Sequence, residues 1–218
     1  MDISQNYIEA VKAIKEAILR SQYRAAASVN KEQLSLYYGI GRYVSENSRR
    51  GFWGKGAVEQ ISSMLQKELP GLRGFSTRSI KNMRQFYEEW KVVLNQQPMA
   101  ADLRLDEKLL LVEIRQPLAA EFNWTDFLSI GFSHHIEIIA KTKTLEARLF
   151  YIHECAIRYW SKYTLRDYLK ADLYHHQGAL PNNFAQTLPD TKQAIKAIRS
   201  FKDEYLLDFI NVEELNEQ

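Results

Sequence analysis

The spacing of apolar residues is the feature that most constrains the fold of this chain. Apolar side chains recur every three or four positions along most of the sequence, which places them on one side of an α-helix. The first such set is Ile8, Val11, Ile14 and Ile18. Gly and Pro are scarce, with 9 and 5 residues, which argues against a turn-rich β architecture. The sequence predicts an all-α, multi-helix bundle, with one short β-hairpin at residues 103–111 left open because the pattern there is ambiguous.

Capping residues and chain breaks divide the first half into four predicted helices. The first follows a capping box at residues 2–5, and Asn30 is predicted to cap the second. The third lies between a glycine-rich break at residues 51–56 and Pro70. Ser76 is predicted to cap the fourth helix, which reaches about residue 95.

The second half is also predicted to be helical. It follows a linker that begins at Pro98. The helices expected here are residues 106–115, a short helix opened by Ser133, residues 145–159, a helix from Ser161 to about residue 175, and residues 191–209. This organisation predicts two helical subdomains, residues 1–97 and 98–218.

Composition narrows the class of protein. The single cysteine, Cys155, excludes an intramolecular disulfide and a multi-cysteine zinc site, which suits a reducing compartment. No apolar run approaches the ~20 residues that a transmembrane helix needs. The N-terminal segment is amphipathic and contains acidic residues, so it is not typical of a signal peptide. These features predict a cytoplasmic protein that does not insert into a membrane.

Charge is distributed unevenly along the chain, although the net charge is only +2. Residues 49–84 contain eight basic and two acidic residues, a net charge of +6. Residues 202–218 contain one basic and six acidic residues, a net charge of −5. A basic segment of this kind is compatible with a nucleic-acid-binding face, and it is equally the composition of an ordinary solvated surface.

The predicted helix after Ser76 has two distinct sides. Its apolar side carries Ile80, Met83, Phe86, Tyr87 and Trp90, and is expected to pack on the helix with Val58, Ile61 and Leu65. Its polar side carries residue types that contact phosphates and base edges in DNA. The candidate nucleic-acid-binding residues are Lys55, Arg73, Arg78, Lys81, Asn82, Arg84 and Gln85.

This helix pair resembles a helix-turn-helix, whose second helix presents its outer side to DNA. The connection at residues 70–75 is longer than the usual turn of three to four residues. An amphipathic hairpin whose polar side only contacts water fits the same pattern, and the pattern alone does not choose between the two interpretations.

A second candidate surface lies around Trp160 and Ser161, where two predicted helices are joined by a turn of helix-turn-helix length. Its basic residues are Arg158, Lys162, Arg166 and Lys170. The segment at residues 53–90 is preferred because its net charge is larger, so the sequence leaves open which of the two contacts DNA.

The sequence contains no convincing catalytic or metal-binding pattern. Acidic-x-Lys triplets begin at Glu89, Asp106 and Asp190, but all lie in predicted helices or caps, where no sheet can present them to Mg²⁺. Adjacent histidines on a helix diverge by about 100°, so His134–His135 and His175–His176 are interpreted as polar surface or cap positions. Cys155 is expected to be a buried, inert thiol. The glycines at positions 39 and 41 are expected to permit close helix packing. No cofactor or metal is predicted.

Several motifs in a fixed order resemble the N-terminal domain of the YhcG family of bacterial proteins. They include Trp53-Gly54, Gly74-Phe75-Ser76 and Met83-Arg84-x-Phe86-Tyr87 in the first half. In the second half they continue with Ser133-His134, Arg148-x-Phe150-Tyr151, Trp160-Ser161-x-x-x-Leu165 and Tyr205-x-Leu207-Asp208-Phe209. The resemblance therefore extends over nearly the whole chain.

The resemblance implies a helix-turn-helix-like module that binds DNA. In typical members of the family, a PD-(D/E)XK nuclease domain follows it, and this sequence ends about where that domain begins. We therefore expect a non-enzymatic DNA-binding and targeting module of a nuclease-associated protein. The alternative is a protein-interaction or oligomerisation module without DNA contact. The expected partners are DNA, mainly through its phosphates, and a second copy of the chain or a nuclease-system protein.

Overall fold

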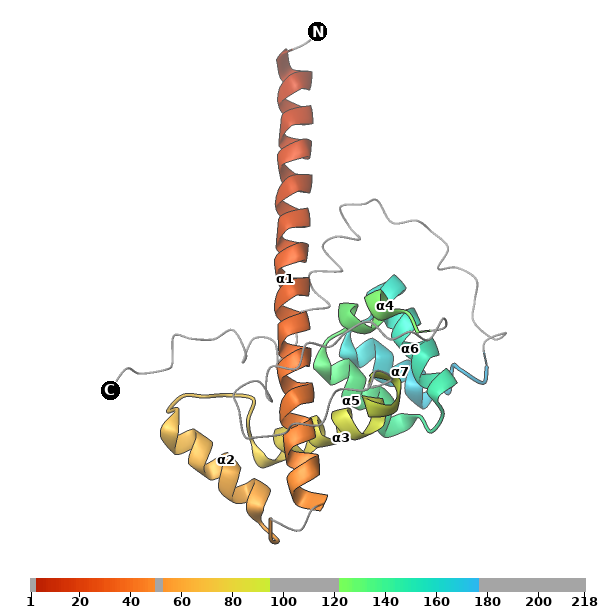
Figure 1. Cartoon of the computed structure of the whole chain (residues 1–218). Coiled ribbons are helices and arrows are strands. Elements are labelled where there is room, and N and C mark those ends of the chain that lie inside the picture. The colour runs from red at the N-terminus through yellow and green to blue at the C-terminus, as the bar shows by residue number, and fades with distance from the viewer. Residues whose placement is uncertain (1–2, 50–52, 95–121, 177–218) are drawn as a thin grey trace.

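A computed structural model of the chain describes residues 3–49, 53–94 and 122–176 (Figure 1). The secondary structure of these residues is helical without strands, which confirms the predicted all-α class. The helices are α1 (Ile3–Arg49), α2 (Ala57–Glu68), α3 (Thr77–Leu94), α4 (Trp124–Ser129), α5 (Phe132–Lys141), α6 (Leu145–Arg158) and α7 (Lys162–Lys170). The predicted β-hairpin at residues 103–111 and the predicted helices at 106–115 and 191–209 lie outside the described residues.

Helix α1 is a single helix of 47 residues, where the sequence pattern predicted two. Asn30, the predicted cap of the second helix, lies buried within it. Its side-chain amide donates hydrogen bonds to the carbonyls of Leu128 (2.8 Å) and Ile130 (3.0 Å). An N-cap residue instead accepts from the first turn of its own helix. The prediction was wrong because Asn30 uses its polar side chain to fasten α1 to the end of α4.

Helices α1 and α3 approach each other closely at Gly41. A Cβ atom at this position would lie 2.0 Å from the carbonyl oxygen of Met83 on α3. No side chain fits in that space, so the two backbones can pack this closely only with glycine here. The expectation that a glycine permits close helix packing is confirmed at Gly41.

The apolar side of α3 forms the centre of the main core. Met83, Phe86 and Trp90 are fully buried in a cluster that also draws on α1 and on helices α4 to α7. Only Ile80 packs on α2, where it contacts Val58 in a smaller cluster at the end of α1. The expected packing on α2 therefore holds for Ile80, whereas the rest of the apolar side packs on α1 and the other helices of the main core. The main core contains residues from both sides of residue 97, and the boundary predicted there stays a prediction.

The second half of the fold is a compact group of short helices beside α1 and α3 (Figure 1). Helix α4, which the sequence pattern missed, is capped by Asn123, whose side chain accepts from the Asp126 amide at 3.2 Å. Helix α5 begins one residue before Ser133, which is buried inside it. Helix α7 begins after Ser161, which caps it by accepting a hydrogen bond from the Thr164 amide at 3.2 Å.

The N-terminal part of α1 extends away from the other helices, whereas its C-terminal part packs between them (Figure 1). Leu34, Tyr37 and Val44 in the second half of α1 are buried, while Val11 and Ile14 in the first half are largely exposed. No helix in the described segments has the length and apolar character needed to cross a membrane.

Candidate nucleic-acid interface

The first half of α3 presents basic side chains because its opposite side is fixed in the core. Ser76 caps the helix by accepting a hydrogen bond from the Ser79 amide at 3.2 Å. Ile80 and Met83 in the following turn are 1% and 0% exposed, so this side of the helix faces inward. Helical periodicity then places Arg78 and Lys81 on the outer side, where both are exposed.

The candidate residues of the first surface differ in exposure. Lys55, Arg73, Arg78 and Lys81 are exposed, and Asn82, Arg84 and Gln85 are half-buried. Lys81 Nζ lies 2.7 Å from Glu59 Oε1, which brings the first turn of α2 beside the second turn of α3. The ammonium group of Lys81 lowers the pKa of the Glu59 carboxyl by donating a hydrogen bond to it.

Two arginines on α3 have no carboxylate partner among the described residues. Arg78 and Arg84 take part in no ion pair or hydrogen bond with the part of the chain that the structure describes. We call the group of Arg78, Lys81 and Arg84 the α3 basic surface; its only carboxylate partner among the described residues is Glu59. The positive charge does not continue along the helix, because the next two charged residues are Glu88, which accepts from Ser45 Oγ at 2.7 Å, and Glu89.

The second candidate surface, formed by α6 and α7, is built around a tight turn. Tyr159, at the end of α6, adopts a left-handed conformation with φ of 52°, and Ser161 caps α7 two residues later. The ring of Trp160 stacks on Tyr168 at a centroid distance of 4.3 Å, and Leu165 is fully buried. These contacts hold α7 with its basic side outward.

Carboxylates neutralise most of the basic residues of this second surface. Arg158 pairs with Glu154, and Arg166 pairs with Glu137 on α5. Lys170 lies 3.8 Å from Asp167, and Lys162 lies over the ring of Tyr163 at 5.6 Å. The turn of the second surface is therefore closer to helix-turn-helix length, whereas fewer of the basic residues of the α3 basic surface are paired with carboxylates.

The two histidines of α5 are core residues, and their interpretation as surface or cap positions was wrong. His134 and His135 are 3% and 0% exposed. Their Nε2 atoms lie 2.9 Å from the Trp160 carbonyl oxygen and 3.0 Å from the Phe127 carbonyl oxygen. Burial lowers the pKa of His135 to about 3, so this imidazole is neutral and donates its Nε2 proton to Phe127. Apart from the apolar residues that surround the pair, no local pattern indicated this burial.

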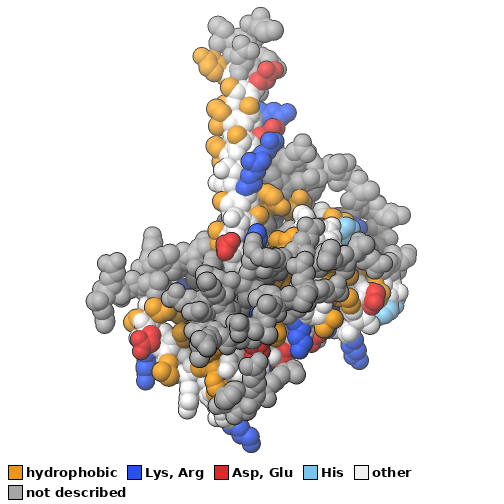
Figure 2. Space-filling model, in the orientation of Figure 1, with side chains coloured by type: hydrophobic (Ala, Val, Ile, Leu, Met, Phe, Trp, Pro, Cys, Tyr) orange, Lys and Arg blue, Asp and Glu red, His pale blue; other side chains and the backbone are white. Residues whose placement is uncertain are grey.

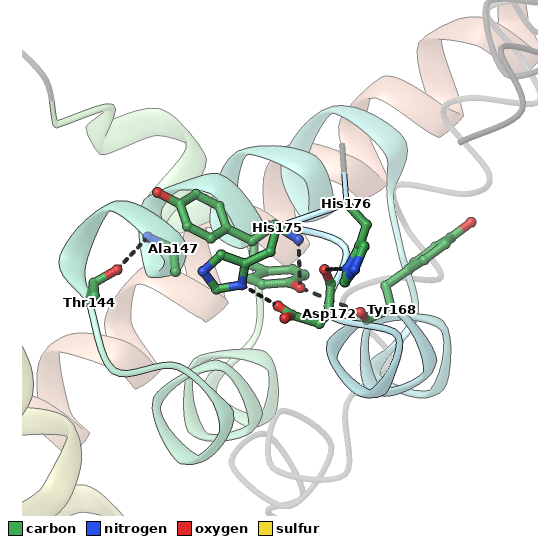
Figure 3. A network of polar contacts seen from close by, with 8 residues as sticks. Thr144, Ala147, Tyr168, Asp172, His175 and His176 are labelled. Carbon is green, nitrogen blue, oxygen red and sulfur yellow. Dashed lines mark hydrogen bonds and ion pairs between the residues drawn. The ribbon is translucent and has the colours of Figure 1, made fainter. Parts of the chain in front are cut away.

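The two histidines after α7 are exposed, as expected, and both bind Asp172 (Figure 3). His175 Nδ1 lies 2.7 Å from the Asp172 carboxylate, and His176 Nδ1 lies 2.9 Å from the Asp172 carbonyl oxygen. In the same network, Tyr151 Oη on α6 accepts from the Tyr174 amide at 3.1 Å. This network fastens the turns after α7 to α6.

The side chains singled out as catalytic or metal-binding candidates have other roles or lie outside the described segments. They contain no group of three or more His, Cys, Asp and Glu side chains able to hold a metal ion. Glu89, in the first acidic-x-Lys triplet, pairs with Arg148 at 2.8 Å, and the triplets at Asp106 and Asp190 lie outside the described residues. Cys155 is buried, as expected, and burial raises the pKa of its thiol, which opposes formation of a nucleophilic thiolate.

Comparison with known families yields one match. A model of the DUF1016 N-terminal domain matches residues 13–176, which include the α3 basic surface and helices α4 to α7. No curated protein and no solved structure matches the chain. The matched region spans most of the sequence, and it corresponds to the N-terminal domain that the motifs around Trp53, Phe86 and Trp160 resemble. The chain therefore belongs to the DUF1016 N-terminal domain family, the N-terminal domain of the YhcG family.

Proposed function

We propose that this chain is a DNA-binding module that targets a nuclease-associated system, and that it contacts duplex phosphates through the α3 basic surface. One observation carries the proposal: Arg78 and Arg84 have no carboxylate partner among the described residues, on a helix whose other side is fixed in the core. Arginine is the side chain best suited to bind a phosphate with two hydrogen bonds. Fixing the helix in advance lowers the conformational cost of forming such contacts.

The position of Arg78 in the first turn of α3 supports the same proposal. The N-terminal residues of a recognition helix are those that reach the major groove in helix-turn-helix proteins. The N-terminal end of a helix also carries a partial positive charge that attracts phosphate. The connection between α2 and α3, residues 69–76, is longer than a standard turn, so we propose a helix-turn-helix-like unit with an extended turn.

The proposed role is non-catalytic. Membership of an N-terminal domain family supports a binding role, and the resemblance described above supports an association with a nuclease. On this proposal the chain brings the nuclease activity of another domain or protein to DNA and performs no chemistry itself.

A DNA titration tests the proposal. Fluorescence anisotropy with a labelled duplex of about 20 base pairs would be measured for the unaltered chain and for Arg78→Ala/Arg84→Ala. The matched control is Lys141→Ala/Lys143→Ala, which removes the same charge from two exposed lysines at the end of α5. We expect the α3 variant to weaken binding about tenfold or more and the control to weaken it much less. Equal losses in the two variants would contradict the proposal, because they would reflect net charge alone.

The second surface is tested in the same assay with Lys162→Ala/Lys170→Ala. Binding that depends on these lysines and not on the arginines of α3 would move the interface to α7. A protein-interaction module remains the second candidate function, because the N-terminal half of α1 carries large apolar side chains that are exposed. Absence of binding to duplex DNA at low salt would favour that candidate.

A further inference from the structure

The projecting part of α1 exposes large apolar side chains on one side. Tyr7, Val11, Ile14 and Ile18 are 69%, 65%, 59% and 51% exposed. Figure 2 shows hydrophobic side chains gathered along one edge of this part of the helix, with charged side chains across from them. A contiguous apolar patch of this size is often an interaction site. We call these four residues the α1 stripe.

The spacing within the α1 stripe is that of a coiled-coil seam. Its members follow one another at intervals of four, three and four residues, which is the alternation of the a and d positions of a heptad. Ala10 and Ala17 flank the stripe and are exposed, so a second helix can approach closely. By helical periodicity, Glu9 and Glu16 lie on the opposite side of the helix. The stripe is therefore shaped to pack against another helix.

We propose that the α1 stripe is a self-association surface, on which a second copy of this chain packs its own α1 in antiparallel orientation. In this orientation Tyr7 faces Ile18 of the second copy, and Val11 faces its Ile14. The same pairing is repeated by the two-fold symmetry, so all four apolar positions of both copies are covered at once. A two-fold interface requires this kind of self-complementarity.

The arrangement of the other helices favours the antiparallel orientation. In Figure 1, α2 lies beside the lower end of α1, on the same side as the row of hydrophobic side chains that Figure 2 shows in the same orientation. A second α1 running parallel along that side would meet α2 at its lower end. An antiparallel helix instead continues past the N-terminal end of α1, where the other described helices do not reach (Figure 1).

The area of the stripe sets the expected strength of the dimer. At 51–69% exposure, each of the four side chains leaves on the order of 100 Å² in contact with water, so two copies would bury roughly 800–1,000 Å². This is at the lower limit of specific protein–protein interfaces. The dimer is therefore expected to be weak and to form in a concentration-dependent manner.

Sedimentation velocity on the full chain from low to high micromolar concentration tests the proposal. We expect the weight-average mass to rise toward that of a dimer, and we expect Ile14→Glu/Ile18→Glu to remain monomeric. The control is Val92→Glu/Ile157→Glu, which places the same charges at exposed aliphatic residues outside the stripe. Circular dichroism confirms that both variants keep their helical content. The proposal is overturned if the unaltered chain stays monomeric at all concentrations, which is also the result expected if another segment of the chain covers the stripe. It is overturned as well if the control variant dissociates as fully as Ile14→Glu/Ile18→Glu.

Disulfide trapping tests the orientation. The antiparallel register places Tyr7 opposite Ile18 of the second copy, whereas two Tyr7 residues lie roughly 16 Å apart along the helix axis. We expect a mixture of Tyr7→Cys and Ile18→Cys to form a disulfide-linked heterodimer under mild oxidation, and Tyr7→Cys alone to stay unlinked. The buried Cys155 does not interfere. Efficient self-linking of Tyr7→Cys would contradict the antiparallel register. Neither experiment depends on DNA, so its result is independent of the proposed function.

Discussion

Lowering the pH from 7.5 to 5 is expected to destabilise the fold through His135. This side chain is fully buried, and the rings of Phe127, Phe86 and Trp90 lie around it at centroid distances of 4.3, 5.2 and 5.9 Å. Its Nε2 proton is donated to the Phe127 carbonyl oxygen at 3.0 Å. A second proton on this ring would place a charge in an apolar environment, and burial accordingly lowers the pKa to about 3.

The magnitude follows from the difference between the folded and unfolded pKa values of His135. In the unfolded chain the imidazole titrates at its ordinary pKa of 6.5, so between pH 6.5 and 3 the unfolded state binds a proton that the folded state does not. The contribution of neutral His135 is thus fully present above pH 6.5 and is lost as the pH falls. One pKa unit corresponds to about 1.4 kcal/mol, so the expected loss in the free energy of unfolding is about 2 kcal/mol at pH 5.

Urea unfolding followed by circular dichroism at pH 7.5, 6.5, 5.75 and 5 measures this loss. The informative variant is His135→Gln, which keeps a neutral donor near the position of Nε2 and does not titrate. We expect it to be less stable at pH 7.5 and to lose less stability on acidification. His153→Gln is the control, because this histidine on α6 has a side chain that is 55% exposed. If His135→Gln shows the same pH dependence as the unaltered chain, another group is responsible for the loss and His135 is not.

Three further substitutions test the packing and capping of the helices by the same unfolding assay. Gly41→Ala places a Cβ 2.0 Å from the Met83 carbonyl oxygen, which forces α1 and α3 apart. We expect the free energy of unfolding to fall by about 3 kcal/mol or more. A loss below about 1 kcal/mol would mean that the two backbones are not in close contact. Asn30→Ala removes the amide that donates hydrogen bonds to the carbonyls of Leu128 and Ile130, and it is expected to lower the free energy of unfolding by about 2–3 kcal/mol. The control is Ser28→Ala, at an exposed position of the same helix, which is expected to change the stability little. Ser76→Ala removes the cap of α3 and is expected to cost about 1 kcal/mol, whereas Ser76→Asp is expected to keep most of the stability.

The helical class and most helix boundaries were predictable because they depend on local patterns. The apolar period of three to four residues identifies α2, α3, α6 and α7, and the caps at Ser76 and Ser161 act on amides three residues away. Helix α4 was missed because it is only six residues long, too short for a period to repeat.

Several errors in the sequence-based predictions concern polar residues whose partners are distant in the sequence. Asn30 has the residue type of a helix cap, yet its hydrogen bonds reach Leu128 and Ile130, about 100 positions along the chain. His134 bonds to the Trp160 carbonyl oxygen across 26 positions. A local pattern contains no information about such partners, so the burial of these polar side chains becomes visible only in the folded chain.

The sequence was sufficient to predict which basic residues share one side of α3, but not which of them pair with carboxylates. Helical periodicity places Arg78 and Lys81 on one side of α3. The pairing of Lys81 with Glu59 depends on how α2 returns beside α3, and the pairing of Arg166 with Glu137 depends on the packing of α7 on α5. These pairings distinguish the two candidate surfaces, which the sequence left undecided.

The salt dependence of DNA binding shows whether the α3 basic surface contacts phosphates. Each phosphate contact that is lost should reduce the slope of log K against log salt by about 0.9 for duplex DNA. We predict that Arg78→Ala/Arg84→Ala reduces the slope by about 1.8 relative to the unaltered chain, and that Lys141→Ala/Lys143→Ala changes it little. An unchanged slope in the first variant, or no binding by the unaltered chain at low salt, would contradict the claim that the α3 basic surface binds DNA.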